Sequence, residues 1–333
     1  MKQLLCLALA GALLAGCRKP DAIDCGPIPI APVPAAPNTF SNISLSDFFA
    51  KYGAPLQRQG FVIGQSQAIR SAAGAVLSVA GVAFRDAGNN PARDSAYLYW
   101  REVYRVPAMV LSDMPTNSQA GQVLISGGEF ELQVRKPGGQ LLRVSPTVGS
   151  NSSTLPLLQS PIPAEQDTTR QQLWQRASSA VGWALAPGAP PVQTVQQSQV
   201  QGPAYQVRLP LDSIRYVNID QLWRAYQGSS TTAVSIGVPT ATANANDTRV
   251  WVRPVGFNGL YRVAPGAVPT SGAPASYTAP LPLGASLKAV VLQSINGQLY
   301  FGTQTFTVQP GLTITPPLAP LSEAAAVALI QAL

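Results

Sequence analysis

Two glutamates separated by one residue are the first candidates for chemistry in this sequence. Glu129 and Glu131 fall on one face of an expected strand, roughly 7 Å apart at a rise of about 3.4 Å per residue. Two carboxyl groups at such a distance can serve as acid and base in the hydrolysis of glycosidic bonds. The sequence contains no histidine, so the commonest general base and the commonest metal ligand are both absent. Alternation of charged with apolar residues is also typical of a solvated sheet face, and we favour that interpretation over catalysis.

Oxygen-bearing side chains gather in a second segment, where Asp86, Asn89, Asn90 and Asp94 fall within nine residues. Such oxygens could bind calcium, but their spacing does not match a calcium-binding EF-hand loop. Asn followed by Asn and Pro predicts a turn instead. A serine–lysine dyad is a further alternative, although no motif places a serine beside a candidate lysine. The sequence therefore predicts no metal site and no cofactor.

The tryptophans are the residues best suited to stack on a sugar ring, since a flat aromatic face matches the apolar face of a saccharide. Trp100, Trp223 and Trp251 are the candidates for ligand stacking. Each has β-branched or aromatic neighbours that are typical of strands, so packing in a core is the competing interpretation.

An apolar run over residues 4–14 follows a short start that contains Lys2. Its length fits the core of a secretory signal and is well short of the roughly 20 residues that span a bilayer. The closing sequence Leu14-Ala15-Gly16-Cys17 resembles the lipobox of bacterial lipoproteins. The resemblance implies cleavage between Gly16 and Cys17, with fatty acyl chains such as palmitate on Cys17. Several chains hold a protein at a membrane, because each buried CH₂ contributes about 0.8 kcal/mol.

The residues that follow the expected cleavage point bear on location. In Gram-negative lipoproteins an Asp after the lipidated cysteine favours the inner membrane, whereas this chain has Arg18. The resemblance therefore implies an outer-membrane lipoprotein, on either the periplasmic or the surface face. Residues 17–42 are rich in proline, which predicts an extended tether. With Cys6 in the signal and Cys17 acylated, Cys25 remains as a spare or intermolecular thiol.

The distribution of charge argues against one class of partner. The chain has 22 basic and 15 acidic residues, and its basic residues are scattered, with no run beyond Arg18-Lys19. Nucleic-acid binding requires a clustered basic surface, so we do not expect it.

The remaining sequence predicts the architecture. A chain of 333 residues with 46% hydrophobic composition can bury two medium-sized cores. Short alternating strands separated by Gly, Pro and Asn predict a mainly β fold with two sandwich-like domains and a few short helices. We place the first sandwich at 43–150, a linker at 151–203, the second sandwich at 204–310 and a tail with an amphipathic helix at 311–333. The number of strands predicted for the second sandwich favours an immunoglobulin or fibronectin III type.

Several local elements can be predicted in more detail. A helix over 44–52 would be capped by Ser44 or Ser46, and another would follow Ser322 and dock on the second sandwich. Residues 165–184 favour a helix over two short strands around Trp174 and Trp183.

Two turns also carry clear signals. A type II turn is expected at 136–139, because Pro137 suits its second position and Gly138 can supply the positive φ of its third. Asn296-Gly297 predicts a type I′ hairpin.

Four segments carry a resemblance to known proteins. Residues 74–84 resemble the opening strand and turn of the β-sandwich domain shared by ankyrins and netrin receptors. Residues 101–104, 109–116 and 126–130 resemble envelope lipoproteins of Bacteroidetes. The resemblance falls within residues 74–130 and implies a β-sandwich. Some relatives of the ankyrin-type domain cleave themselves at a His-Phe-Ser site, and this chain lacks histidine.

Taken together, these features predict a non-catalytic lipoprotein that acts as a structural or interaction module of the cell envelope. Its expected partners are the membrane, through the lipid on Cys17, and an envelope protein or polysaccharide. A surface glycan-binding lipoprotein is the first alternative, and a carboxylate-dependent hydrolase of envelope polymers is the second.

Overall fold

The computed structural model describes residues 42–79, 82–144, 155–163, 170–177, 182–188, 191–196, 198–209, 216–238, 247–266 and 275–333. The chain divides into two compact units, Met1–Asn38 and Thr39–Leu333, and all described residues belong to the second unit. The predicted signal, almost all of the tether and the three cysteines lie outside the described residues. The described chain is mainly β and forms two sandwiches with short helices, as predicted. In these residues no helix is long and apolar enough to cross a membrane.

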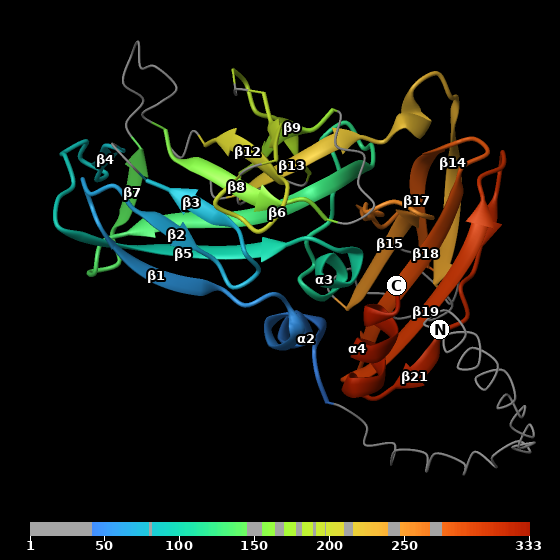
Figure 1. The fold of residues 1–333 in the computed structure, drawn as a ribbon. Coiled ribbons are helices and arrows are strands. Elements are labelled where there is room, and N and C mark those ends of the chain that lie inside the picture. The colour runs from blue at the N-terminus through green and yellow to red at the C-terminus, as the bar shows by residue number, and fades with distance from the viewer. Residues whose placement is uncertain are drawn as a thin grey trace, which may run out of the picture. The chain divides into compact units, whose positions relative to one another are not determined.

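Two antiparallel sheets form the first sandwich (Figure 1). The larger sheet contains β1 (Gln57–Val62), β5 (Ser95–Val103), β6 (Leu124–Arg135), β13 (Tyr216–Leu222), β9 (Gln172–Arg176) and β10 (Ala184–Leu185), in that order, with β7 (Leu141–Val144) beside β6 and β4 (Phe84–Arg85) beside β7. The smaller sheet has the order β11 (Gln193–Val195), β12 (Ala204–Arg208), β8 (Leu157–Pro161), β3 (Val76–Ser78) and β2 (Ala68–Arg70).

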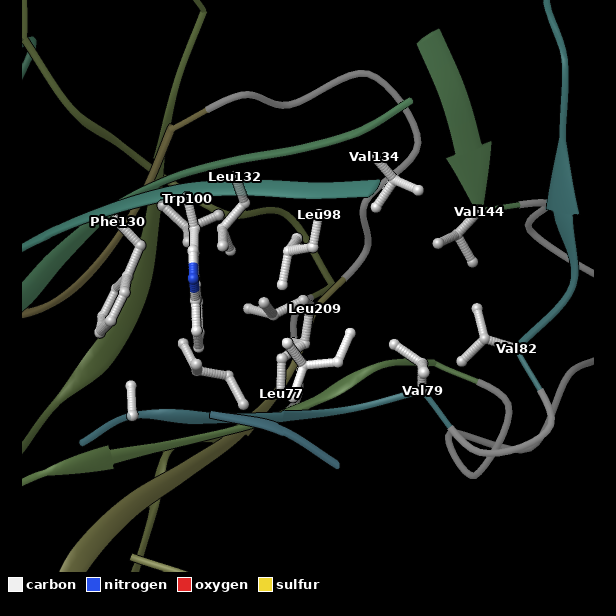
Figure 2. Packing of buried hydrophobic residues seen from close by; sticks show 14 of the residues in the cluster. Leu77, Val79, Val82, Leu98, Trp100, Phe130, Leu132, Val134, Val144 and Leu209 are labelled. Carbon is white, nitrogen blue, oxygen red and sulfur yellow. The ribbon is translucent and has the colours of Figure 1, made fainter. Parts of the chain in front are cut away.

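The core of the first sandwich lies between these sheets. Trp100 is completely buried and points from β5 toward the strand that carries Leu77, with Phe130 and Leu132 beside it (Figure 2). The even-numbered residues of β6 from Phe130 to Val134 face this core, as the alternation predicts. Burial of these large side chains removes apolar surface from water and favours the sandwich.

The second sandwich packs a three-stranded sheet against a five-stranded sheet. The smaller one has the order β17 (Ala275–Pro282), β14 (Thr231–Val238) and β20 (Thr313–Ile314), with β14 and β20 parallel. The larger one has the order β16 (Tyr261–Arg262), β15 (Thr248–Pro254), β18 (Ser286–Ile295), β19 (Gln298–Thr307) and β21 (Ala319–Leu321). A 3₁₀ turn, η2 (Arg224–Tyr226), follows β13.

Three helices cover the outer face of the five-stranded sheet, namely α2 (Leu45–Tyr52), α3 (Val106–Leu111) and α4 (Glu323–Gln331) (Figure 1). Val290 and Leu292 of β18 face the helices, whereas Val291 faces the other sheet. A strand buried on both faces requires a continuous apolar run, which residues 289–292 provide. The predicted helices are confirmed, with Ser44 and Ser322 as their N-caps.

A β-bulge joins the two sandwiches through β6 and β13. Asn218 pairs with Glu129 and Asp220 pairs with Ser126, so Gly127 and Gly128 together face the single residue between them on β13. Because of the extra residue, odd-numbered side chains face inward before the bulge and even-numbered side chains face inward after it. Val123 and Ile125 contribute to the second core, whereas Phe130 and later even-numbered residues contribute to the first.

An ion-pair cluster connects α3 to the second sandwich. Asp113, two residues after the end of α3, accepts hydrogen bonds from Arg249 Nε at 2.9 Å and from Arg262 Nη1 at 3.1 Å. The two arginines belong to β15 and β16, so one carboxylate fixes α3 to the five-stranded sheet. Asp113 has a φ of 49°, in the left-handed region that Asp and Asn tolerate better than most residues.

The predicted domain boundary is wrong. Tyr205 and Val207, placed by the sequence at the start of the second sandwich, belong to the first core, because β12 pairs with β8 and β11. Residues 151–203 were predicted to form a linker, but their described parts include β8, β9, β10 and β11. Local alternation identifies a strand but does not identify its partner.

Two local predictions also need correction, and one is confirmed. The helix expected over 165–184 is contradicted where the structure describes it, because Gln172–Arg176 is strand β9. The turn at 136–139 has its positive φ, 85°, at Gly139 and not at Gly138. This is typical of a type I turn followed by a left-handed residue, not of a type II turn. The Asn296-Gly297 turn has positive φ at both residues, as a type I′ turn requires.

We expect Asp113→Asn to lower the free energy of unfolding by roughly 1 to 3 kcal/mol, since it leaves two partly buried arginines without their carboxylate. Urea denaturation would measure the change. As a control, Asp86→Asn removes a single, longer ion pair with Lys136 (3.7 Å) and should change stability by less than about 1 kcal/mol. Equal effects of the two substitutions would contradict the role given to Asp113.

Candidate ligand-binding pocket

A surface pocket of about 350 Å³ lies where α3, the β15–β16 connection and the end of α4 meet. Its polar and aromatic side chains are supplied by Arg105, Arg253, Phe257, Asn258 and Gln331. Its remaining wall comes from Val106, Pro107, Pro163, Gly256 and Leu333. We call this site the Arg105–Arg253 pocket.

Arg105 is held at the rim by the start of α3. It is the N-cap residue, with extended backbone (φ −132°, ψ 152°), and Pro107 follows in the first turn. Proline suits this position because its missing N–H would have no partner within a helix start. The side chain of Met109 and its neighbours anchor α3 in the helix-covered core. Arg105 itself is exposed.

The β15–β16 connection supplies the aromatic wall. Gly256 has a φ of 80°, which a glycine adopts without strain. Phe257 is 49% exposed, and its ring centroid lies 6.1 Å from that of Trp223. A large aromatic side chain that is half exposed yet supported by a buried ring is well placed for a ligand to cover.

Asn258 fixes this connection to the bulged part of β6. Its Nδ2 donates to the carbonyl oxygens of Tyr104 and Ser126, both at 2.7 Å. Its own carbonyl accepts from the Ser126 N–H, also at 2.7 Å. The next residue must be a glycine, because a Cβ at position 259 would lie 2.6 Å from the Leu124 carbonyl oxygen. The pocket wall is therefore held in place before any ligand binds.

The second arginine of the pocket lies on β15. Arg253 donates through Nη1 to the main-chain oxygen of Leu333. Burial lowers the pKa of Arg253 from its ordinary value, although a guanidinium stays charged at neutral pH. Within the described ranges, neither Arg105 nor Arg253 forms an ion pair with a side-chain carboxylate. The pocket consequently carries positive charge without a matching acidic side chain.

The tryptophans predicted to stack on a ligand are buried, so that prediction is corrected. Trp100 and Trp251 are 0% exposed, and Trp223 is 6% exposed. Trp100 fills the first core, and Trp251 packs under the helices with Phe49 edge-on at 6.3 Å. Only Trp223 comes near the pocket, as the support for Phe257. Phe257 was not among the residues predicted to bind a ligand, although its place between Gly256 and Asn258 marks a loop tip.

The two candidate glutamates are also buried, contrary to the solvated face that we expected. Glu131 is 2% exposed and lies 3.7 Å from Arg101, and Glu129 is 0% exposed. Arg176 lies near Glu129 and stacks over the ring of Trp183, which covers part of this sheet face. Neither glutamate lines the Arg105–Arg253 pocket.

A buried acidic cluster forms around Glu129. Ser126 donates to Asn218 Oδ1 at 3.0 Å, and Asn218 in turn donates to Asp220. Among the residues that are described, both Glu129 carboxyl oxygens lack a hydrogen-bond partner. Burial raises the pKa of Glu129 well above its usual range, repulsion from Asp220 adds to the rise, and Arg176 opposes it. Burial likewise raises the pKa of Asp220, against a lowering contribution from Ser126.

This cluster predicts how stability depends on pH. Because their pKa values are raised, we expect the folded protein to retain protons on Glu129 and Asp220 that the unfolded chain releases above pH of about 4. The contribution that these two carboxyl groups make to the free energy of unfolding is therefore complete below that pH and is lost as pH rises. We expect the free energy of unfolding to fall between pH 4 and 8, by at most about 1.4 kcal/mol per pH unit for each retained proton.

The double variant Glu129→Gln/Asp220→Asn should flatten this decline in urea titrations at successive pH values. Glu323→Gln is the control, because its hydrogen bond with Lys51 lowers the pKa of Glu323. That control should leave the decline in place. A double variant with the same pH profile as the unmodified chain would show that the cluster does not retain protons.

The segment considered for calcium forms the predicted turn. Asp86 Oδ1 accepts from the Asn90 N–H at 2.9 Å, and the Asn89 N–H donates to the Asp86 carbonyl. The Asn90 hydrogen bond is the main reason that the pKa of Asp86 lies below its usual value. Lys136 lies 3.7 Å from the same carboxylate.

Comparison with known proteins adds little. No protein-family model matches the chain, and no curated protein sequence is similar to it. One solved structure, the gamma-CGTase from alkalophilic Bacillus clarkii, aligns with 76% of this chain at 9% sequence identity and a TM-score of 0.18. The aligned part spans only 40% of the length of that enzyme. A likeness this slight carries no argument about fold or function.

Proposed function

We propose that this protein is a non-catalytic lipoprotein of the outer membrane that acts as an interaction module of the cell envelope. The observation that carries the proposal is the apolar run that ends in Leu14-Ala15-Gly16-Cys17, because it supplies both an export signal and a cysteine for lipid attachment. Lipid on Cys17 would hold the protein at the membrane, and the proline-rich segment after it would separate the folded part from the bilayer.

The chemistry of the described residues supports binding in preference to catalysis. Glu129 and Glu131, the carboxylates with suitable spacing for hydrolysis, are buried in a sheet. The Arg105–Arg253 pocket instead presents charge, an amide and an aromatic ring, which bind ligands but do not form an acid–base pair at neutral pH.

Binding of a surface glycan is the second candidate function. Phe257 favours it, because a half-exposed ring beside hydrogen-bond donors is the combination that saccharide sites use. The glycan would be recognised by Phe257, a residue other than the three tryptophans that the sequence suggested.

We expect Cys17→Ala to abolish incorporation of a palmitate analogue and to leave the protein either unprocessed or soluble. On Triton X-114 partitioning, a soluble product would move from the detergent phase to the aqueous phase. Cys25→Ala is the matched control, because no cleavage sequence precedes it, and it should label normally. Undiminished labelling of the Cys17→Ala protein would refute lipid attachment at this residue.

A further inference from the structure

We propose that the Arg105–Arg253 pocket binds a carboxylate-bearing sugar residue of a polysaccharide, with the carboxylate toward the two arginines and the sugar ring against Phe257. This inference rests on the proposed interaction role and names the ligand class of that site.

The charge of the pocket selects an anion. Two arginines line it, and in the described chain no acidic side chain pairs with either one. Arg253 is half buried, so its charge has lost part of its hydration, and among the described residues it bonds the main-chain oxygen of Leu333 and no side-chain carboxylate. A guanidinium matches the planar geometry of a carboxylate and can donate two parallel hydrogen bonds to it.

The size of the pocket limits the ligand. A volume of about 350 Å³ lies at the small end of the range for small-molecule sites, roughly 300 to 1,000 Å³. One or two sugar rings of a longer chain suit such a space. The pocket is open to the surface at Phe257 and Arg105, so a polymer could continue beyond it on either side.

The aromatic wall distinguishes a sugar acid from a simple anion. Phe257 is 49% exposed and is supported by Trp223, so its face is available and its position is set. Inorganic anions gain nothing from such a ring, whereas the C–H face of a sugar buries apolar surface against it. Asn258 anchors the loop through three hydrogen bonds to Tyr104 and Ser126, which reduces the entropy lost on binding.

The test is calorimetric titration of the full-length lipidated protein, in detergent micelles, with oligogalacturonate of defined length. The parallel titrations use the carboxyl-reduced, neutral form of the same oligomer and dextran sulfate. We expect the neutral oligomer to bind at least about tenfold more weakly, because its hydroxymethyl groups cannot form charge-assisted hydrogen bonds. Equal affinity for dextran sulfate would overturn the proposal in favour of unspecific attraction between charges.

Substitutions then locate the binding site. Arg105→Gln and Arg253→Gln should each weaken oligogalacturonate binding by about tenfold or more, and Phe257→Ala by several fold. Arg143→Gln is the control, because it removes the same charge from an exposed residue of β7, outside the pocket. Arg105 and Phe257 are exposed, so their variants should fold even if Arg253→Gln does not.

The outcomes separate this inference from the proposed function. If the acidic and neutral oligomers bind equally and the pocket variants bind normally, the protein binds glycans but the pocket assignment fails. If neither oligomer binds, the sugar-acid inference fails, while lipid attachment is still decided by labelling of Cys17.

Discussion

The rest of this structure depends on one irregularity in the pairing of β6 with β13. A regular ladder would put odd-numbered residues before this point and even-numbered residues after it on opposite faces of the sheet. The extra residue at Gly127-Gly128 shifts the parity, so Ile125, opposite Gln221, and Phe130, opposite Val217, lie on the same face. Residues before it pack into the second sandwich, and residues after it pack into the first. Two cores are thereby built on one continuous strand.

Steric contacts require glycine at both positions of the bulge. A Cβ on Gly127 would lie 2.6 Å from the ring of Tyr205, and Gly128 has a φ of 146° with the ring of Tyr104 2.9 Å from its Cβ position. β5 pairs with β6 only as far as Glu129, so the main-chain groups of Ser126 can bond with Asn258. The loop that carries Phe257 is therefore fixed to β6 just before the bulge.

The sequence was sufficient for features that depend on near neighbours. Helix caps at Ser44 and Ser322, the inward face of β6 and the Asn296-Gly297 turn were all predictable, because each is encoded within a few residues. Pairing between distant strands was not. The sequence alone predicts that β12 begins a new domain, and only the pairing of β12 with β8 places Tyr205 in the first core.

The candidate site was even less predictable. Arg105 and Arg253 come from distant parts of the chain, so no local sequence pattern shows that they line one pocket. Glu129 and Glu131 look like a solvated pair in the sequence, because alternation cannot show that their face of the sheet is buried. The tryptophans drew attention by residue type, but their size makes them core residues here, and the smaller Phe257 takes the exposed position.

The bulged strand is expected to make the two sandwiches one cooperative body. Native-state hydrogen exchange at increasing denaturant measures this cooperativity through the amides of Leu132 in β6 and Val290 in β18. We expect both amides to exchange through one global opening, with the same free energy and the same dependence on denaturant. Exchange of Val290 through a separate opening of lower free energy would contradict it.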